Sequence, residues 1–361
     1  MSGAGVTNIG RRYAEEGQEE RGERAMVMAR GAANHGSDAF ITTDSLLLER
    51  VPRNWVEGAN LMSVRDALGL LGLFLRVRED FVVDFGEGYR GHYDRAMFYW
   101  VLVRDLTPAG WRWFSACVAS DTHTGDDALT SIGESVLQRI ERSFRARDRM
   151  HEKLQLPPSL DAATEAVFYF DVALFMLGGA FDGVAKIAHV AHGLGSIDDQ
   201  RVGWSKKWLK KLTAVNEPLA QMMAWGQPHR DAREMIAVLR NVIHQEILRT
   251  STWVTRGERT ERVIVPRSIE PSLEELVGRA GTLDEFGLSR QIDRRLYIDP
   301  GIYLEAVLPH AFAAINAFME ATTVENLPGV DAANLPTGPP TDDDTFTGEI
   351  ADRIRLLGGV G

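Results

Sequence analysis

The sequence is poor in cysteine, with Cys117 as the one cysteine among 361 residues. This excludes an intrachain disulfide and any zinc or iron–sulfur site built from several cysteines. A lone cysteine is typical of proteins in a reducing compartment, so we expect a cytoplasmic location. The first 30 residues contain Glu15, Glu16, Glu19 and Glu20 in place of an apolar core, and we therefore expect no secretory signal peptide.

Long apolar runs are missing as well. The most apolar stretch covers residues 166–181, which is shorter than the roughly 20 residues of a membrane-spanning helix, and it contains Asp171. We therefore expect this stretch to be a buried core helix, and we expect no membrane partner.

An excess of positive charge is also absent, because 40 Lys and Arg residues stand against 51 Asp and Glu residues and the formal net charge is −11. Such a balance argues against nonspecific coating of nucleic acid over the whole surface, although it still allows a local basic face. Hydrophobic residues make up 44% of the chain, which is enough to build one or two globular cores.

Helical periodicity dominates the central part of the chain. Ile132, Val136, Ile140 and Phe144 recur every fourth position, which predicts an amphipathic helix. Two β-branched runs near residues 252–266 predict a small β-hairpin insertion. The predicted fold class is mostly α, with a helical N-terminal region followed by an up-and-down helical bundle that carries this hairpin.

Composition divides the chain into four segments. Residues 1–38 have few large apolar side chains and residues 326–361 are rich in proline and aspartate, so both are predicted to be flexible tails. Adjacent prolines at positions 157 and 158 separate an N-terminal helical domain, residues 39–156, from the helical bundle, residues 157–325.

Three positions carry the signature of a helix N-cap. Ser63 is followed three residues later by Asp66, and Thr107 and Asp299 each precede a proline. We expect a helix to begin just after each of these positions.

Two short motifs suggest cofactors but lack the required context. Residues 86–91, GEGYRG, match the glycine pattern of dinucleotide-binding loops, yet no turn follows that would end a helix and start a second strand before Asp105. Residues 120–127, SDTHTGDD, contain three carboxylates and an imidazole, but their spacing matches no standard metal loop. We predict neither a nucleotide cofactor nor a metal site.

A basic segment with two tryptophans, WSKKWLKK, covers residues 204–211. Trp204 and Trp208 lie one helical turn apart and are expected to pack into the bundle, which leaves the lysines on a solvated face. Such a face can contact RNA phosphates or an acidic protein partner. The candidate RNA contacts are Lys206, Lys207, Lys210, Lys211 and, on a later helix, Arg233.

Two polar stripes align on predicted helices of the bundle. Asp171 and Asp182 fall on one face of the first helix, and Arg233, Arg240 and His244 fall on one face of the second. If the two helices are antiparallel neighbours, the carboxylates pair with the basic side chains at the edge of the core. This interpretation makes the stripes structural.

The segment Arg240-Asn241-Val242-Ile243-His244 also resembles the Arg-Asn…His signature of HEPN domains, helical bundles that include metal-independent ribonucleases. The resemblance covers roughly residues 159–322. Active members of that family usually have four to six residues between Arg and His, whereas three separate Arg240 from His244. This departure favours a noncatalytic bundle, although the spacing of i to i+4 still projects both side chains from one face.

The resemblance implies roles for the residues of the motif. His244 would take the proton of a ribose 2′-hydroxyl, Arg240 would hold the phosphate, and Asn241 would orient it. Asp171 or Asp182 would face the motif from the earlier helix, no metal would be needed, and the active form would be a homodimer.

Three functional interpretations remain open at this point. The first is a HEPN-like ribonuclease or RNA-binding module. The second is a noncatalytic interaction or structural protein in which Arg240 and His244 pair with core carboxylates. The third is an enzyme with a small-molecule pocket among the N-terminal aromatic residues Tyr93, Tyr99, Trp100, Trp111 and Trp113, for which aromatic core packing is the simpler explanation.

Overall fold

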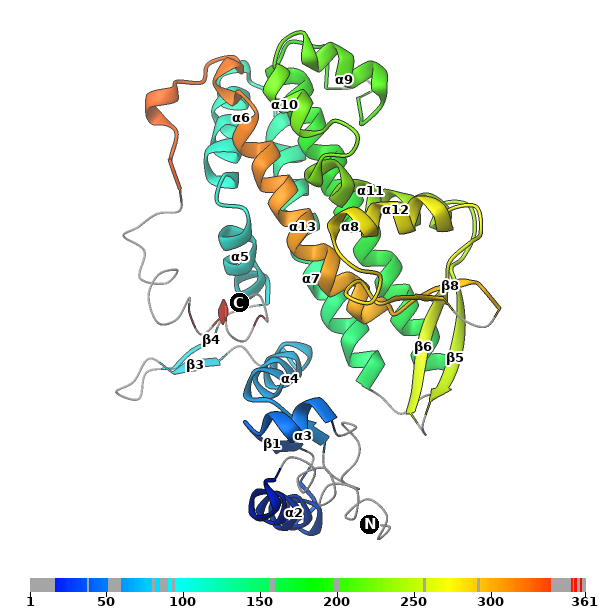
Figure 1. The fold of residues 1–361 in the computed structure, drawn as a ribbon. Helices are drawn as coiled ribbons and strands as arrows, with labels where there is room; N and C mark the ends of the chain where they lie inside the picture. Colours follow the sequence, from blue (N-terminus) through cyan, green and yellow to red (C-terminus); the bar gives the residue numbers. More distant parts are fainter. Residues whose placement is uncertain are drawn as a thin grey trace. The chain divides into compact units, whose positions relative to one another are not determined.

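We describe the protein from a computed structural model of the whole chain (Figure 1). The structure describes residues 17–37, 39–50, 60–79, 82–84, 90–92, 95–155, 160–197, 202–255, 258–290, 293–338 and four residues between 352 and 358. The chain divides into two compact units, Met1–Leu75 with Arg355–Gly361, and Arg76–Ile354.

The first unit contains short elements near the N-terminus. They are α2 (Glu19–Asn34), β1 (Ala39–Ile41), α3 (Ser45–Arg50), β2 (Asn60–Met62) and most of α4 (Val64–Val77), and β1 pairs with β2 in parallel. The segment predicted to be a flexible tail, residues 1–38, contains the helix α2. That prediction considered only the lack of apolar residues, whereas the alanine, glutamate and arginine of this stretch are strong helix formers.

The second unit is mostly α, which confirms the predicted fold class. Its helices are α5 (Arg95–Leu106), α6 (Gly110–Thr124), α7 (Ala128–Gln155), α8 (Leu160–Ala191), α9 (Lys206–Thr213), α10 (Glu217–Met222), α11 (Pro228–Ile243), α12 (Glu270–Ala280) and α13 (Pro300–Ala321). The long helices α7, α8 and α13 form its centre (Figure 1). The expected domain boundary at the two prolines instead falls between α7 and α8 within this one unit.

Helices α7 and α8 form the closest helix pair of the bundle, and only residues 156–159 separate them in sequence. Glycines on α8 permit this approach, because a Cβ atom on Gly183 would overlap the Val136 side chain of α7. A Cβ on the neighbouring Gly179 would likewise overlap Arg139. Side chains of α7 therefore pack directly against the glycines of α8.

Helix α13 packs against both α8 and α11 and completes the core. The buried Tyr303 of α13 donates a hydrogen bond of 2.9 Å to the backbone oxygen of Met235 in α11, and its ring meets Phe170 of α8 edge-on. Phe144 of α7 stacks on Phe312 of α13 with ring centroids 5.0 Å apart. Aromatic side chains of α13 therefore contact three other helices, α7, α8 and α11.

The predicted hairpin is part of a larger sheet. Strands β5 (Arg249–Thr255) and β6 (Glu258–Ile264) are antiparallel as expected, but β7 (Leu288–Arg290) and β8 (Leu296–Ile298) extend them to the strand order β5-β6-β8-β7. The added strands lie between α12 and α13 in sequence. They are short and all-buried or mixed in exposure, so they lack the alternating pattern of a half-buried strand.

The glycine-rich segment near residue 86 connects two strands. β3 (Val82–Asp84) pairs antiparallel with β4 (Arg90–His92), and residues 85–89 lie outside the described residues. A dinucleotide-binding loop instead leads from a strand directly into a helix. The glycine-rich segment therefore lies between two antiparallel strands and not between a strand and a helix.

Two of the three predicted N-caps are confirmed. Ser63 accepts a hydrogen bond from the backbone nitrogen of Asp66, and Asp299 accepts one from Ile302. Thr107 does not cap α6, because its hydroxyl donates to the Val103 backbone oxygen in the preceding helix.

The compact part of the chain continues past the predicted boundary at residue 325. Val324 and Leu327 are buried, and Glu325 forms an ion pair with Arg112 of α6. The short 3-10 helices Val324–Asn326 and Ala332–Asn334 follow α13. The buried Leu327, directly before Pro328, therefore anchors the first part of the predicted tail.

Two helices, residues 161–191 and Pro300–Ala321, are long and apolar enough to cross a membrane by length and composition alone. Helix α8 is therefore longer than the apolar stretch considered in the sequence. In each case 56% of the most apolar window is buried inside the structure, and the core helices of soluble proteins pass the same test.

We predict that Gly183→Ala destabilises the protein by about 1–3 kcal/mol, because the added methyl group overlaps Val136 in a close-packed core. Gly278→Ala in α12 is the matched control, since no atom lies within 4 Å of its added Cβ. The control should gain about 0.5–1 kcal/mol from higher helix propensity. Urea unfolding measures both changes, and equal stabilisation by the two substitutions would contradict the packing described here.

Candidate functional site

Arg240 of the RNVIH motif forms an ion pair with Asp182 of α8. Its Nη1 atom lies 2.8 Å from Asp182 Oδ2, and the two side chains are 20% and 40% exposed. The arginine stem crosses α8 at Gly178, where a Cβ atom would come 2.6 Å from Arg240 Cδ. The structure thus contains the carboxylate–arginine pair that the structural interpretation of the stripes predicts.

The other polar residues of the motif lie on the surface, whereas its Val242 is buried. Asn241 and His244 are exposed, and His244 is the C-cap residue of α11. The His244 ring meets Phe175 edge-on, with ring centroids 4.8 Å apart. Among the described residues, no carboxylate forms a hydrogen bond with the His244 side chain, so nothing there orients the imidazole for proton transfer.

Asp171 is separated from the motif. It precedes Asp182 by eleven residues on α8, which is about 16 Å along a helix axis. Its Oδ1 atom is buried and accepts no hydrogen bond in the described part of the chain, and burial raises the pKa of this carboxyl to about 7. The structure therefore brings Asp182, and not Asp171, to Arg240.

The lysines of α9 lie on a solvated face, as the sequence predicts. Trp204 and Trp208 are buried, and Trp208 Nε1 donates a 3.2 Å hydrogen bond to Nδ1 of the buried His189. Ser205 caps the helix by accepting from the Trp208 backbone nitrogen. The four exposed lysines are Lys206, Lys207, Lys210 and Lys211.

Arg233 is not part of this lysine face. It forms an ion pair with Glu234 at 2.8 Å and lies over the Trp204 ring at 5.8 Å from the centroid. Its side chain is 17% exposed. Arg233 thus packs against Trp204, and its role as an RNA contact stays a prediction.

In the segment 120–127, which contains three carboxylates and an imidazole, Asp121 caps the start of the next helix. The buried Asp121 carboxylate accepts hydrogen bonds from the backbone nitrogens of Leu129 and Thr130 at the start of α7. Within the described ranges, no three His, Cys, Asp or Glu side chains are grouped as metal ligands.

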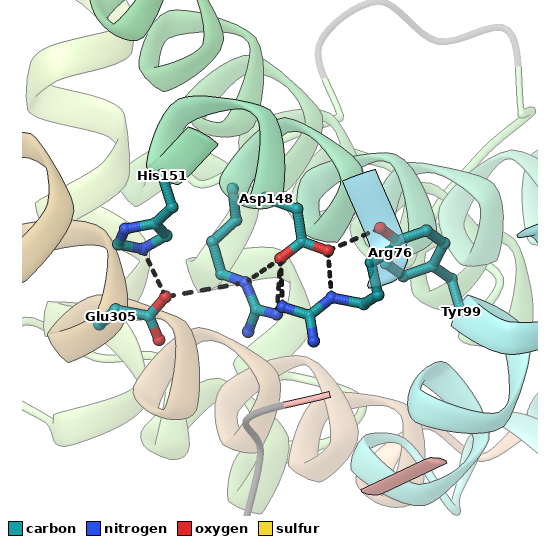
Figure 2. Close-up of polar contacts among 6 residues, drawn as sticks. Arg76, Tyr99, Asp148, His151 and Glu305 are labelled. Atoms are coloured by element: carbon teal, nitrogen blue, oxygen red, sulfur yellow. Dashed lines mark hydrogen bonds and ion pairs between the residues drawn. The ribbon is translucent and has the colours of Figure 1, made fainter. Parts of the chain in front are cut away.

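A buried charged cluster lies between α7, α5 and the last turn of α4 (Figure 2). The Asp148 carboxylate accepts hydrogen bonds from Arg76 Nε at 2.6 Å and Arg76 Nη2 at 2.8 Å. The Tyr99 hydroxyl donates a third hydrogen bond of 2.6 Å. All three side chains are nearly inaccessible to solvent. This is a bidentate pair of the kind that arginine forms best.

The cluster extends to α13 through the buried Arg147. Its Nη2 atom lies 2.9 Å from Asp148 Oδ1, and its Nε atom lies 3.7 Å from Glu305 Oε1. His151 Nε2 lies 2.8 Å from the same Glu305 oxygen (Figure 2). Two arginines and two carboxylates thus balance in charge across α7 and α13, which offsets the desolvation of each.

This environment shifts the titration of the cluster. Burial alone would raise the pKa of Asp148, but the charges of Arg147 and Arg76 and the hydrogen bonds from Arg76 and Tyr99 lower it to about 2. Burial and the neighbouring Asp148 raise the pKa of Tyr99 far above its ordinary value. Asp148 is therefore charged and Tyr99 is neutral at any physiological pH.

A cavity of about 480 Å³ lies beside the cluster, and Tyr99, Arg76 and Asp148 line part of it. Among the described members of the predicted aromatic set, Tyr99 alone reaches this cavity, whereas Trp113 is fully buried in the core. Tyr93 of that set lies outside the described residues. Further lining side chains come from the first half of α8 and from an arginine-rich stretch of α7.

Comparisons with protein-family models, with curated proteins and with solved structures find no match to this chain.

Sequence analysis missed the cluster and the cavity. The three arginines at positions 142, 145 and 149 follow a helical spacing of i, i+3 and i+7, a signal that marks one face of α7. That signal does not reveal what the face meets, because Arg76 lies 72 residues from Asp148 in sequence.

We predict that Asp148→Asn destabilises the protein by about 3–5 kcal/mol at pH 6, because two arginines would remain buried without their carboxylate. Tyr99→Phe is the milder comparison, since it removes one hydrogen bond at a cost of about 1–3 kcal/mol. Urea unfolding of the three proteins measures both values.

Wild type and Asp148→Asn together also test the pKa of Asp148. A lowered folded-state pKa supplies stability that is present above the unfolded value of 3.8 and is lost as the pH falls toward 2. The difference in unfolding free energy between wild type and Asp148→Asn should therefore shrink from pH 6 to pH 3. A constant difference would refute this assignment of charge.

Proposed function

We propose that this protein is a noncatalytic helical protein that binds RNA through the lysine face of α9. The lysine face consists of Lys206, Lys207, Lys210 and Lys211. The observation that carries the proposal is the burial of Trp204, Trp208 and Leu212, which turns all four lysines toward solvent. None of the four has an acidic partner among the described residues, so their charges are available to phosphates.

The likeness of the RNVIH segment to HEPN domains supports RNA rather than an acidic protein as the partner. The burial of Trp204 and Trp208 also determines which kind of RNA contact is available. No tryptophan of α9 is exposed for base stacking, so the contacts are with backbone phosphates and binding is tolerant of sequence. Such binding weakens steeply with salt.

The ion pair of Arg240 supports the noncatalytic part of the proposal. A ribonuclease would need this guanidinium for the scissile phosphate, and Asp182 occupies it at 2.8 Å. His244 lacks an orienting carboxylate in the described ranges, as a general base would require. In this proposal the motif holds α11 to α8. The homodimer that the resemblance implies stays a prediction.

We predict that Lys207→Gln/Lys211→Gln weakens binding of a fluorescent single-stranded RNA and lowers the slope of log affinity against log salt by about 0.7 for each lysine. Arg267→Gln/Arg294→Gln is the matched control, because it removes two exposed positive charges elsewhere and should leave the slope unchanged. Fluorescence anisotropy at several salt concentrations gives both slopes. Equal losses in the two variants, or binding of an acidic peptide but not of RNA, would overturn the proposal.

We predict that labelled RNA stays intact with wild-type protein in EDTA, with no more cleavage than with His244→Ala.

Arg240→Ala should leave RNA binding unchanged but lower the unfolding free energy by about 1–2 kcal/mol, because it removes a partly exposed ion pair and the stem packed on Gly178. Gel analysis and urea unfolding supply the two readouts. Cleavage that disappears in His244→Ala would instead establish a ribonuclease.

A further inference from the structure

The cavity beside Asp148 has one strongly basic wall. Arg142, Arg145 and Arg149 project from one face of α7, and Arg76 joins them from the end of α4. The one carboxylate of the lining is Asp148, whose oxygens are already bonded to Arg76, Arg147 and Tyr99. An anion entering the cavity would therefore meet four guanidinium groups and one carboxylate in the lining.

Two of these arginines are only weakly engaged by the protein itself. Arg142 forms one long hydrogen bond of 3.4 Å to Gln138 and has no acidic partner among the described residues. Arg145 lies 3.5 Å from Glu141, its neighbour one helical turn earlier. Arg149, in contrast, pairs with Glu152 at 3.0 Å. Arg142 and Arg145 are therefore the side chains most able to turn to a ligand.

The part of the cavity lining that α8 supplies is apolar and aromatic. Tyr169, Val172 and Met176 occur at i, i+3 and i+7 on α8 and are each partly exposed. The antiparallel packing of α7 and α8 sets this stripe beside the arginine stripe. The cavity thus offers charge on one side and a surface for a ring or a hydrocarbon on the other.

The floor of the cavity is fixed before any ligand arrives. Asp148 holds Arg76 by two hydrogen bonds and holds the Tyr99 hydroxyl by a third. A site whose polar groups are already oriented loses less conformational entropy when a ligand binds. Asp148 is in this sense a positioning residue of the cavity.

We propose that this cavity binds an organic phosphate of mononucleotide size. Arg142 and Arg145 would hold the phosphate, and the body of the ligand would lie against Tyr169, Val172 and Met176. Guanidinium groups bind phosphate oxygens bidentately, and several arginines match the double charge of a phosphate monoester better than the single charge of a carboxylate. A volume of about 480 Å³ lies within the range of small-molecule sites.

The proposal does not rest on RNA binding by α9. The lysine face and the cavity share no residue, so each can be removed without the other. The cavity takes the phosphate of a small molecule with a body to fill the apolar wall, whereas the lysine face offers charge alone.

Isothermal titration calorimetry of the full chain at low salt tests the proposal with AMP, hexyl phosphate, adenosine and inorganic phosphate. We expect saturable 1:1 binding of AMP or hexyl phosphate and at least tenfold weaker binding of adenosine and inorganic phosphate. Tighter binding of AMP identifies an aromatic body, and tighter binding of hexyl phosphate identifies an aliphatic one. Absence of binding by both organic phosphates, or equal binding of inorganic phosphate, overturns the proposal.

Two double variants locate the binding. Arg142→Gln/Arg145→Gln should raise the Kd of the bound organic phosphate at least tenfold and leave RNA binding unchanged, whereas Lys207→Gln/Lys211→Gln should do the reverse. If the first variant is unfolded, Arg142→Gln alone serves, because Arg142 is exposed. Tyr169→Leu should weaken AMP without affecting inorganic phosphate. An unchanged Kd in the arginine variants would overturn the proposal even if AMP binds.

Discussion

The close packing of α7 against α8 is the constraint on which the rest of the second unit depends. Gly179 and Gly183 let the two helices approach so far that side chains of α7 fill the place of a Cβ. Once this register is set, the arginine stripe of α7 faces the stripe of Tyr169, Val172 and Met176 on α8. The adjacent Gly178 gives Arg240 the room to reach Asp182. The place of the cavity and the Arg240–Asp182 pair thus both depend on small residues of α8.

The charged cluster adds specificity to this packing. Hydrophobic side chains alone would allow α13 to slide along the bundle, since apolar contacts are not directional. The pairing of Arg147 with Asp148 on one side and with Glu305 on the other admits one arrangement of α7 and α13 in which every charge is compensated. Leaving the buried Arg147 or Asp148 unpaired would cost several kcal/mol. The cluster therefore selects the arrangement that also shapes the cavity.

Sequence reasoning succeeded at most positions where the structure is determined locally, with Thr107 as an exception. The caps at Ser63 and Asp299, the hairpin strands and the buried tryptophans of α9 each depend on residues a few positions apart. It failed where distant segments meet. Strand β8 is fixed by pairing with β6 and β7, and the cavity needs Arg76 and α8 to meet α7. Helix α2 was missed for a different reason, since only burial and not helix propensity was weighed.

The RNVIH segment shows why a motif alone left the function open. Spacing of i to i+4 places Arg240 and His244 on one helix face whether they cleave a phosphate or brace two helices. The two roles differ in the groups that the motif contacts. Those groups belong to α8, where Asp182 pairs with Arg240 and the ring of Phe175 contacts His244. A carboxylate at hydrogen-bond distance competes with phosphate for the same guanidinium. Among the described residues, weakly paired cations lie instead on α9 and on the cavity face of α7.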